Sequence, residues 1–81
     1  MDVTEVQALL QAHMPECEFH VQSEGGHYHI EAIGDVFDGL RPVKKQQLVY
    51  AALGQSIAEG AMHAVNIRTY TRAEWEARAS A

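Results

Sequence analysis

Histidines are the residues of this sequence best suited to chemistry. Imidazole is a common ligand of transition metals, and the 81-residue chain holds five, namely His13, His20, His27, His29 and His63. His27 directly follows Gly25 and Gly26, where a hairpin edge would let its ring turn toward a metal or a partner. His63 stands beside the small residue Ala64, which leaves its ring uncrowded. A solvated turn histidine and a satisfied strand-end histidine are the structural alternatives for these two.

The other three histidines fit structural roles. His13 ends a predicted helix, where a cationic ring interacts favourably with the helix dipole. His20 and His29 share the outward phase of two neighbouring predicted strands. We therefore expect His20 and His29 to face each other as a cross-strand pair.

The chain cannot supply a complete set of ligands for an iron–sulfur cluster. A two-iron cluster needs four ligands, usually thiolates, although two imidazoles can replace two thiolates on one iron. Cys17 is the only cysteine, and its inward phase predicts a buried thiol that behaves as a small hydrophobe. Any such cluster would need thiolates from another molecule. Zinc on His27, His63 and a carboxylate such as Glu24 is the alternative, although no HExxH motif or cysteine pair supports it.

Composition and motifs exclude several function classes. No GxSxG elbow, glycine-rich phosphate loop or CxxC motif occurs, so we expect a protein that is not an enzyme. A single cysteine rules out an intrachain disulfide and favours the reducing cytoplasm. No stretch approaches the roughly 18 apolar residues of a membrane span, and the start lacks the features of a secretory signal. The net charge of −5 disfavours nucleic acid at long range.

The first half of the chain predicts a helix followed by a hairpin. Eighty-one residues suffice for one domain, which we place at residues 1–81. Thr4 and Gln7 form a capping box, so a helix should run from about Thr4 to His13. Alternation from Cys17 predicts a strand, the segment 23–26 a turn, and residues 27–33 a second, antiparallel strand.

The second half predicts a helix, a strand and a last helix. Pro42 opens a long helix that continues to Gly60, with its apolar face formed by Val43, Val49, Leu53 and Ile57. Residues 63–69 form the third strand, and Thr71 with Glu74 caps a last helix that carries Trp75. A right-handed crossover makes the third strand parallel to the second. The prediction is an α+β fold of order αββ(turn)αβα, with a three-stranded mixed sheet and helices packed on one face.

Three blocks of the sequence resemble one family. The run FDGLRPVKKQQLVY at residues 37–50, His63-Ala64-Val65 and TRAEW at residues 71–75 are similar to the BolA family, specifically its IbaG branch. The resemblance extends from about Val3 to Trp75 without a large insertion. It implies an αββααβ-type fold akin to the type II KH domain, in agreement with the predicted element order.

The resemblance also implies a partner and a cofactor. BolA-like proteins associate with monothiol glutaredoxins, which bring a cysteine and bound glutathione to a shared [2Fe–2S] cluster, while the BolA-like chain adds imidazole or thiol ligands. The family's C-terminal histidine matches His63, and the ligand from the loop between the first two strands matches His27, with His29 as the alternative. The implied role is cluster trafficking to apo-targets, or an iron, redox or acid-stress response. Because metals bind neutral imidazole, acidification should weaken ligation.

Two other functions stay open. Arg41, Lys44 and Lys45 cluster at the start of the long helix, where they could meet phosphates, and the KH-like fold also suggests nucleic-acid binding. KH domains clamp nucleic acid with a GxxG loop, whereas the segment Gly39 to Pro42 lacks the second glycine. The cluster could instead be a docking patch for an acidic partner. A module that contacts glutaredoxin without metal is the remaining alternative.

Overall fold

The structure is a computed structural model that describes residues 2–60 and 64–80, so His63 lies outside the described residues. Along the chain the elements are α1 (Val3–His13), β1 (Glu18–Glu24), β2 (His27–Ile33), the 3-10 turn η1 (Asp35–Phe37), α2 (Pro42–Ala58), β3 (Ala64–Tyr70) and α3 (Arg72–Ser80). Within the described ranges, no helix is both long and apolar enough to cross a bilayer.

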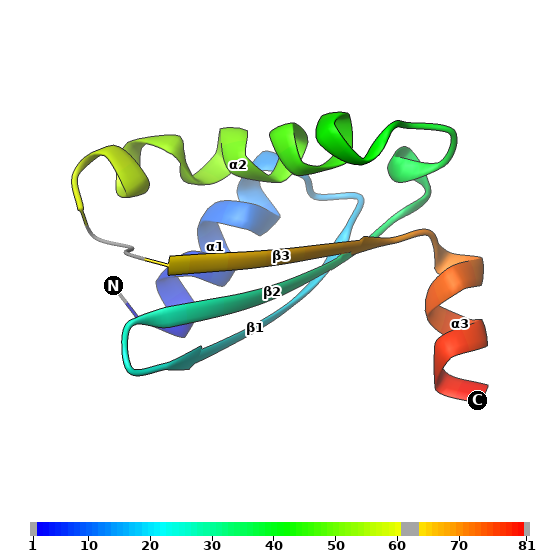
Figure 1. The fold of residues 1–81 in the computed structure, drawn as a ribbon, viewed down its shortest axis with the longest axis horizontal. Helices are drawn as coiled ribbons and strands as arrows, with labels where there is room; N and C mark the ends of the chain where they lie inside the picture. The colour runs from blue at the N-terminus through cyan, green and yellow to red at the C-terminus, as the bar shows by residue number, and fades with distance from the viewer. Residues whose placement is uncertain (1, 61–63, 81) are drawn as a thin grey trace.

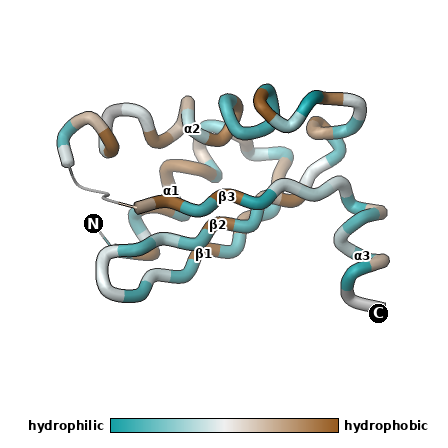
Figure 2. The backbone as a smooth tube through the Cα atoms, in the orientation of Figure 1, coloured by the Kyte–Doolittle hydropathy of each residue, from teal (hydrophilic) through white to brown (hydrophobic). Residues whose placement is uncertain are grey.

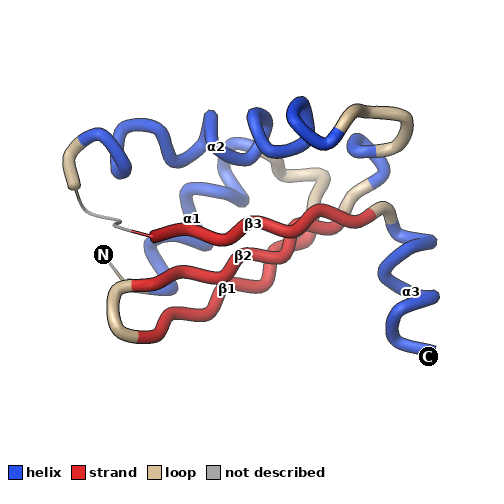
Figure 3. The backbone as a smooth tube through the Cα atoms, in the orientation of Figure 1, coloured by secondary structure: helices blue, strands red, loops and turns tan. Residues whose placement is uncertain are grey.

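The three strands form one mixed sheet in the order β1-β2-β3. β1 is antiparallel to β2 and β2 is parallel to β3, which confirms the predicted crossover. Helices α1 and α2 cover one face of this sheet, and α3 stands beyond the end of β3 (Figure 1; Figure 3). The predicted α+β fold class is confirmed.

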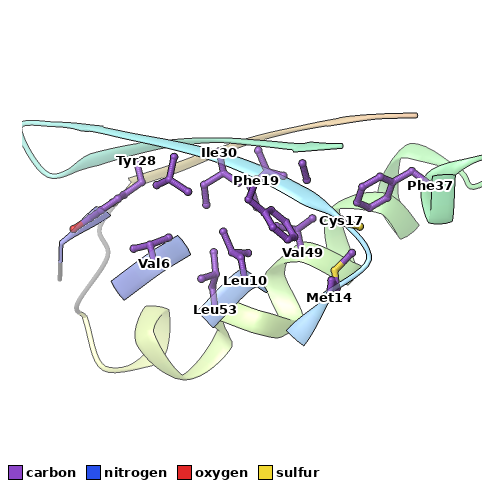
Figure 4. Close-up of a cluster of buried hydrophobic side chains, with 13 residues drawn as sticks. Val6, Leu10, Met14, Cys17, Phe19, Tyr28, Ile30, Phe37, Val49 and Leu53 are labelled. Carbon is purple, nitrogen blue, oxygen red and sulfur yellow. The ribbon is translucent and has the colours of Figure 1, made fainter. Parts of the chain in front are cut away.

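The core lies between the sheet and the two helices that cover it. Figure 4 shows side chains from α1, α2 and the strands meeting there. Both predicted inward strand phases are buried, as the alternating colours along the strands in Figure 2 illustrate. The fully buried side chains include Val6, Leu10, Phe37, Val49 and Leu53. The other face of the sheet therefore carries the outward residues of all three strands.

The N-cap of the first helix lies two residues earlier than the capping-box prediction. Asp2 is its N-cap, and the Asp2 carboxylate accepts a hydrogen bond from the Glu5 N–H at 2.9 Å. A carboxylate at this position satisfies a free N–H and also interacts favourably with the positive end of the helix dipole. The prediction that Thr4 caps the helix with Gln7 is therefore wrong, because Thr4 lies within the first turn.

The hairpin turn is tighter than predicted, and this sets the strand register. Ser23 and Glu24 belong to β1, and only Gly25 and Gly26 form the turn, with φ of 56° and 85°. Positive φ at both central residues is the geometry that two-residue hairpins favour and that glycine adopts without strain. Glu24 consequently pairs with His27.

This register separates the two histidines that we expected to face each other. His20 lies opposite Glu31, and His29 lies opposite Gln22. The prediction of a His20–His29 pair is wrong because a two-residue turn shifts the pairing by one outward position along the strand. Both rings still lie on the outward face.

The long helix and the third strand follow the prediction with small differences. Val49 and Leu53 are buried, but Val43 is 67% exposed and does not contribute to the apolar face as predicted. Val43 is in the first turn of α2, and the fully buried residues of this helix come later along it. β3 is described from Ala64 to Tyr70, and the inward and outward assignment of Ile67 and Asn66 is confirmed.

Helix α3 begins with a capping box, and its side chains contact residues on the outward face of the sheet. The predicted capping box is confirmed, because the Thr71 N–H donates to Glu74 Oε1 at 2.8 Å and the Glu74 N–H donates to Thr71 Oγ1 at 3.2 Å. Ile33, in the outward phase of β2, is fully buried yet is not part of the main core cluster. Its register partners Glu18 and Tyr70 both contact α3 side chains, so α3 accounts for this burial.

Candidate functional site

The candidate metal ligand His27 is the first residue of β2 and is exposed on the outward face. In the sheet register it stands between Glu24 of β1 and Ala64 of β3. The starts of β2 and β3 lie at the end of the sheet away from α3 (Figure 1). His63 is outside the described residues, but Ala64, which follows it directly in the chain, is the parallel register partner of His27.

The alternative ligand His29 lies further along the same face. It is exposed and pairs with Gln22 and Asn66, two positions away from the row of His27 and Ala64. A shallow hollow of about 150 Å³ is lined by His27, Tyr28, His29, Ala64, Val65 and Asn66. Both imidazoles thus border one depression, but His27 is closer along the register to the residue that follows His63.

Cys17 is far from both histidines and is buried. It is 3% exposed and directly precedes Glu18, which pairs with Ile33 at the opposite end of β2 from His27. Six strand steps of about 3.3 Å place the two ends roughly 20 Å apart. Burial raises the pKa of the Cys17 thiol, an effect that Glu16 reinforces and Arg72 opposes. The prediction of a buried, inward thiol is confirmed, and this thiol cannot share a metal with His27.

The side chains at this end of the sheet could supply some, but not all, of the ligands of a metal group. His27 offers an exposed imidazole, and Glu24 beside it is the carboxylate of the zinc alternative. Among the residues that the structure describes, no group of three or more histidine, cysteine or acidic side chains is placed to hold a metal ion. An imidazole from this end could join a metal group whose other ligands come from elsewhere.

The basic cluster lies at the other end of the molecule. Arg41 and Lys44 are exposed and Lys45 is half-buried at the start of α2, close to α3 rather than to the start of β2 (Figure 1). The Lys45 ammonium is close enough to Glu74 to contribute to the lowering of that carboxyl's pKa, after the larger effect of the Thr71 hydrogen bonds. Val43, between the cations, is 67% exposed, the largest exposed fraction among the large apolar side chains that the structure describes. The structure therefore separates the basic cluster from His27 and His29.

Sequence reasoning missed a second concave region on the outward face. Its hollow of about 430 Å³ is lined by polar side chains of all three strands together with Arg78 of α3. The shared outward phase of Gln22, His29, Asn66 and Arg68 is the sequence signal that places the strand residues there. The contribution of Arg78 has no sequence signal, because it depends on where α3 packs.

This chain is similar to known proteins both in sequence and in fold. A family model described as BolA-like protein matches residues 2–74. The acid stress protein IbaG of Escherichia coli K12 is 44% identical over 75 residues, which cover 93% of this chain and 89% of that protein. A BolA homologue from Coxiella burnetii has a similar structure, with a TM-score of 0.80, 25% identity, and coverage of 94% of this chain and 97% of that one.

A second solved structure supports the fold alone. BolA1 from Mus musculus superimposes with a TM-score of 0.81 at 23% identity, over 94% of this chain and 69% of that one. The family match spans the N-cap of α1, the whole sheet and the start of α3. Sequence and fold agree, and this chain belongs to the BolA family.

Proposed function

We propose that this protein is a cytoplasmic, non-catalytic adaptor that binds a monothiol glutaredoxin and adds imidazole ligands to a [2Fe–2S] cluster shared with that partner and glutathione. His63 and His27 are the proposed ligands. The downstream role is delivery of the cluster to apo-targets or an iron, redox or acid-stress response. Membership of the BolA family and resemblance to the acid stress protein IbaG support this proposal.

One observation supports the choice of ligands above the others. β2 and β3 run parallel, and their register aligns His27 with Ala64, the residue bonded to His63. His63 precedes Ala64 directly in the chain. His29 is aligned with Asn66, two positions further along β3. The register therefore favours His27 over His29 as the second ligand.

The thiolates have to come from the partner. Cys17 is buried at the far end of the sheet, and the chain has no other cysteine. Two thiolates from glutaredoxin and glutathione with two imidazoles from this chain make the four ligands that a two-iron cluster needs. Such a cluster would carry less negative charge than one with four thiolates and would be easier to reduce.

Anaerobic reconstitution tests this proposal. The protein is mixed with a monothiol glutaredoxin, glutathione, iron and sulfide, and the visible absorption and circular dichroism spectra are recorded. His27→Ala and His63→Ala should each change the wild-type cluster spectrum. His29→Ala is the matched control, because it removes an exposed imidazole two residues away on the same strand face, and it should leave the cluster spectrum unchanged.

The outcomes separate three assignments. An unchanged spectrum in the His27→Ala/His63→Ala double variant would contradict ligation by this chain. A change in His29→Ala but not in His27→Ala would move the second ligand to His29. Complex formation without iron that is equal in all variants, together with no colour in any mixture, would leave a docking module without a metal role.

The basic cluster fits an acidic protein partner better than a nucleic acid. Arg41 and Lys44 flank Val43, which is 67% exposed and would gain nothing from a phosphate backbone. Lys45 interacts with the nearby Glu74, which reduces its availability to phosphates. We propose that this patch contacts an acidic surface of the partner. Titration with labelled duplex at two salt concentrations checks the alternative, because binding driven by phosphate contacts would weaken steeply as salt rises.

A further inference from the structure

The larger hollow on the outward face has the volume of a small-molecule site. Its volume of about 430 Å³ is within the range of small-molecule pockets, about 300–1,000 Å³. Neither α1 nor α2 covers this face, and the main lining residues are Gln22, His29, Glu31, Asn66, Arg68 and Arg78. Their outward phase places polar groups toward the hollow from all three strands.

One guanidinium in this hollow has no partner of opposite charge. Arg78 forms an ion pair with Glu31 at 3.2 Å and stacks over Trp75, with Cζ 4.6 Å from the ring centroid. Arg68 is aligned with Glu31 in the register, but its guanidinium makes no hydrogen bond or ion pair within the part of the chain that the structure describes. At this end of the hollow, Glu31 is the one carboxylate beside two guanidiniums, which leaves this end locally positive on a chain of net charge −5.

The charged residues of the hollow are unevenly distributed along the outward face. Glu24, the other acidic residue of the hollow, pairs with His27, four positions along β2 from the row of Glu31 and Arg68. Four strand steps correspond to about 13 Å. The Arg68 end thus attracts an anion, whereas the Glu24 end is suited to neutral or cationic groups.

The hollow is continuous with the candidate ligand end. His29 and Asn66 line both the larger hollow and the smaller one beside His27. A molecule that occupies the larger hollow can therefore extend toward His27 without leaving the sheet surface. An extended tripeptide spans about 10 Å, which covers most of the distance between the two ends.

We propose that this hollow binds a carboxylate of a small peptide thiol of the glutathione type, with Arg68 as the residue that receives the carboxylate and with His29 and Asn66 beside it. The inference rests on the proposed function, which brings this thiol to the His27 end. Arginine binds a carboxylate through two parallel N–H donors, which gives both charge pairing and a fixed orientation. His29 borders this hollow, whereas Arg68 is the residue that binds the carboxylate.

The test uses the metal-free protein alone, without glutaredoxin. Reduced glutathione is titrated against the ¹⁵N-labelled chain, and the amide signals of His29, Asn66 and Arg68 are followed by NMR. We expect saturable shifts at these residues. The diester of glutathione, in which both carboxylates are blocked, is the matched ligand and should produce no saturable shift.

Two variants make the residue assignment specific. Arg68→Gln should weaken glutathione binding about tenfold, the effect of losing one charge-assisted contact. Arg41→Gln changes an exposed arginine that does not line the hollow, and it should bind as the wild type does. Both changes affect exposed side chains, so both variants should fold.

Several results would overturn this inference. Equal shifts with the diester, wild-type affinity in Arg68→Gln, shifts centred on Arg41 and Lys44, or no saturation at all would each exclude carboxylate binding by Arg68. The adaptor proposal is tested by a different experiment, the cluster spectra of the His27 and His63 variants, so the two proposals can fail independently. Glutathione binding to the free chain depends on neither iron nor glutaredoxin.

Discussion

The imidazole of His20 is stacked on the indole of Trp75, with ring centroids 5.3 Å apart and planes inclined by 13°. His20 Nε2 is also hydrogen-bonded to Glu18 Oε2 at 2.6 Å, and the opposite oxygen, Oε1, accepts from Arg72 at 3.4 Å. The first strand and the last helix are thereby joined on the outward face. This contact holds α3 beside the sheet, and Arg78 of α3 lines the proposed thiol site.

Removal of the ring tests this anchor. His20→Ala should lower the free energy of unfolding by about 1 kcal/mol, since an aromatic pair contributes about 0.5–1.5 kcal/mol beyond the area that it buries. Urea unfolding monitored by Trp75 fluorescence measures the loss. His29→Ala, on the same face but without a ring contact, should stay within about 0.5 kcal/mol of the wild type. Equal losses in both variants would show that the stack does not anchor α3.

The same variant should change the titration of Glu18. The hydrogen bond from His20 is the largest cause that lowers the pKa of the Glu18 carboxyl, with smaller contributions from Arg72. In His20→Ala this pKa should therefore rise toward its ordinary value of 4.5. NMR titration of the Glu18 side-chain carbon in both proteins measures the shift, and an identical pKa would contradict the contact.

The capping box of α3 should make the fold sensitive to acid. Hydrogen bonds from Thr71 hold the pKa of Glu74 below its ordinary value of 4.5. Because the folded state binds the Glu74 proton less tightly than the unfolded state, the stabilisation is complete above pH 4.5 and is lost as the pH falls through the folded value. Glu74→Gln keeps the hydrogen-bonding shape without this titration. The stability difference between wild type and Glu74→Gln should shrink between neutral pH and pH 3, and a constant difference would exclude the effect.

The contact between Gly34 and Cys17 should be intolerant of one extra carbon. A Cβ at Gly34 would lie 2.5 Å from Cys17 Sγ, which is buried in the core. Gly34→Ala should therefore lower the free energy of unfolding by about 1–3 kcal/mol through overpacking. Cys17→Ala removes the sulfur and should cost about 1 kcal/mol alone. The double variant should be more stable than the sum of the two losses predicts, and additive losses would show that the two sites do not touch.

Cys17 should react slowly in the folded protein. Burial raises the pKa of its thiol, and the thiolate is the reactive form, so neutral pH leaves little nucleophile. Mass spectrometry should show alkylation by iodoacetamide many times slower in buffer than in denaturing urea. Cys17→Ala should also leave the spectrum of the reconstituted cluster unchanged. A rate equal to that in urea would show that the thiol is accessible.

A large part of the fold is determined by the sequence alone. The strict alternation from Cys17 to Val21 and from Tyr28 to Ala32 has one solution in which the apolar side chains are buried, and this fixed both strands and their inner face. The capping box at Thr71 and Glu74 is equally local, because its two hydrogen bonds span three residues. At Asp2 and Thr4 two good capping residues stand two positions apart, and local preference did not select between them.

The sequence identified the candidate ligands as histidines, but it did not predict how the strands that carry them are aligned. Nothing local to His27 indicates that it is aligned with Ala64, since the two belong to strands separated by the whole of α2. Likewise, the prediction of a His20–His29 pair is wrong because the strand register depends on the length of the turn. One turn residue more or fewer changes the partner of every residue in the hairpin.

The sequence by itself determined which strand residues point inward and which segments are helical, because these features follow from periodicities of two and 3.6 residues. Only the tertiary structure decided which outward side chains share a surface. The stack of His20 on Trp75 and the approach of Arg78 to Glu31 depend on how α3 packs on the sheet. That packing depends on contacts between residues far apart in the chain, and the free energy of burying apolar side chains such as Ile33 involves the whole fold and no single segment.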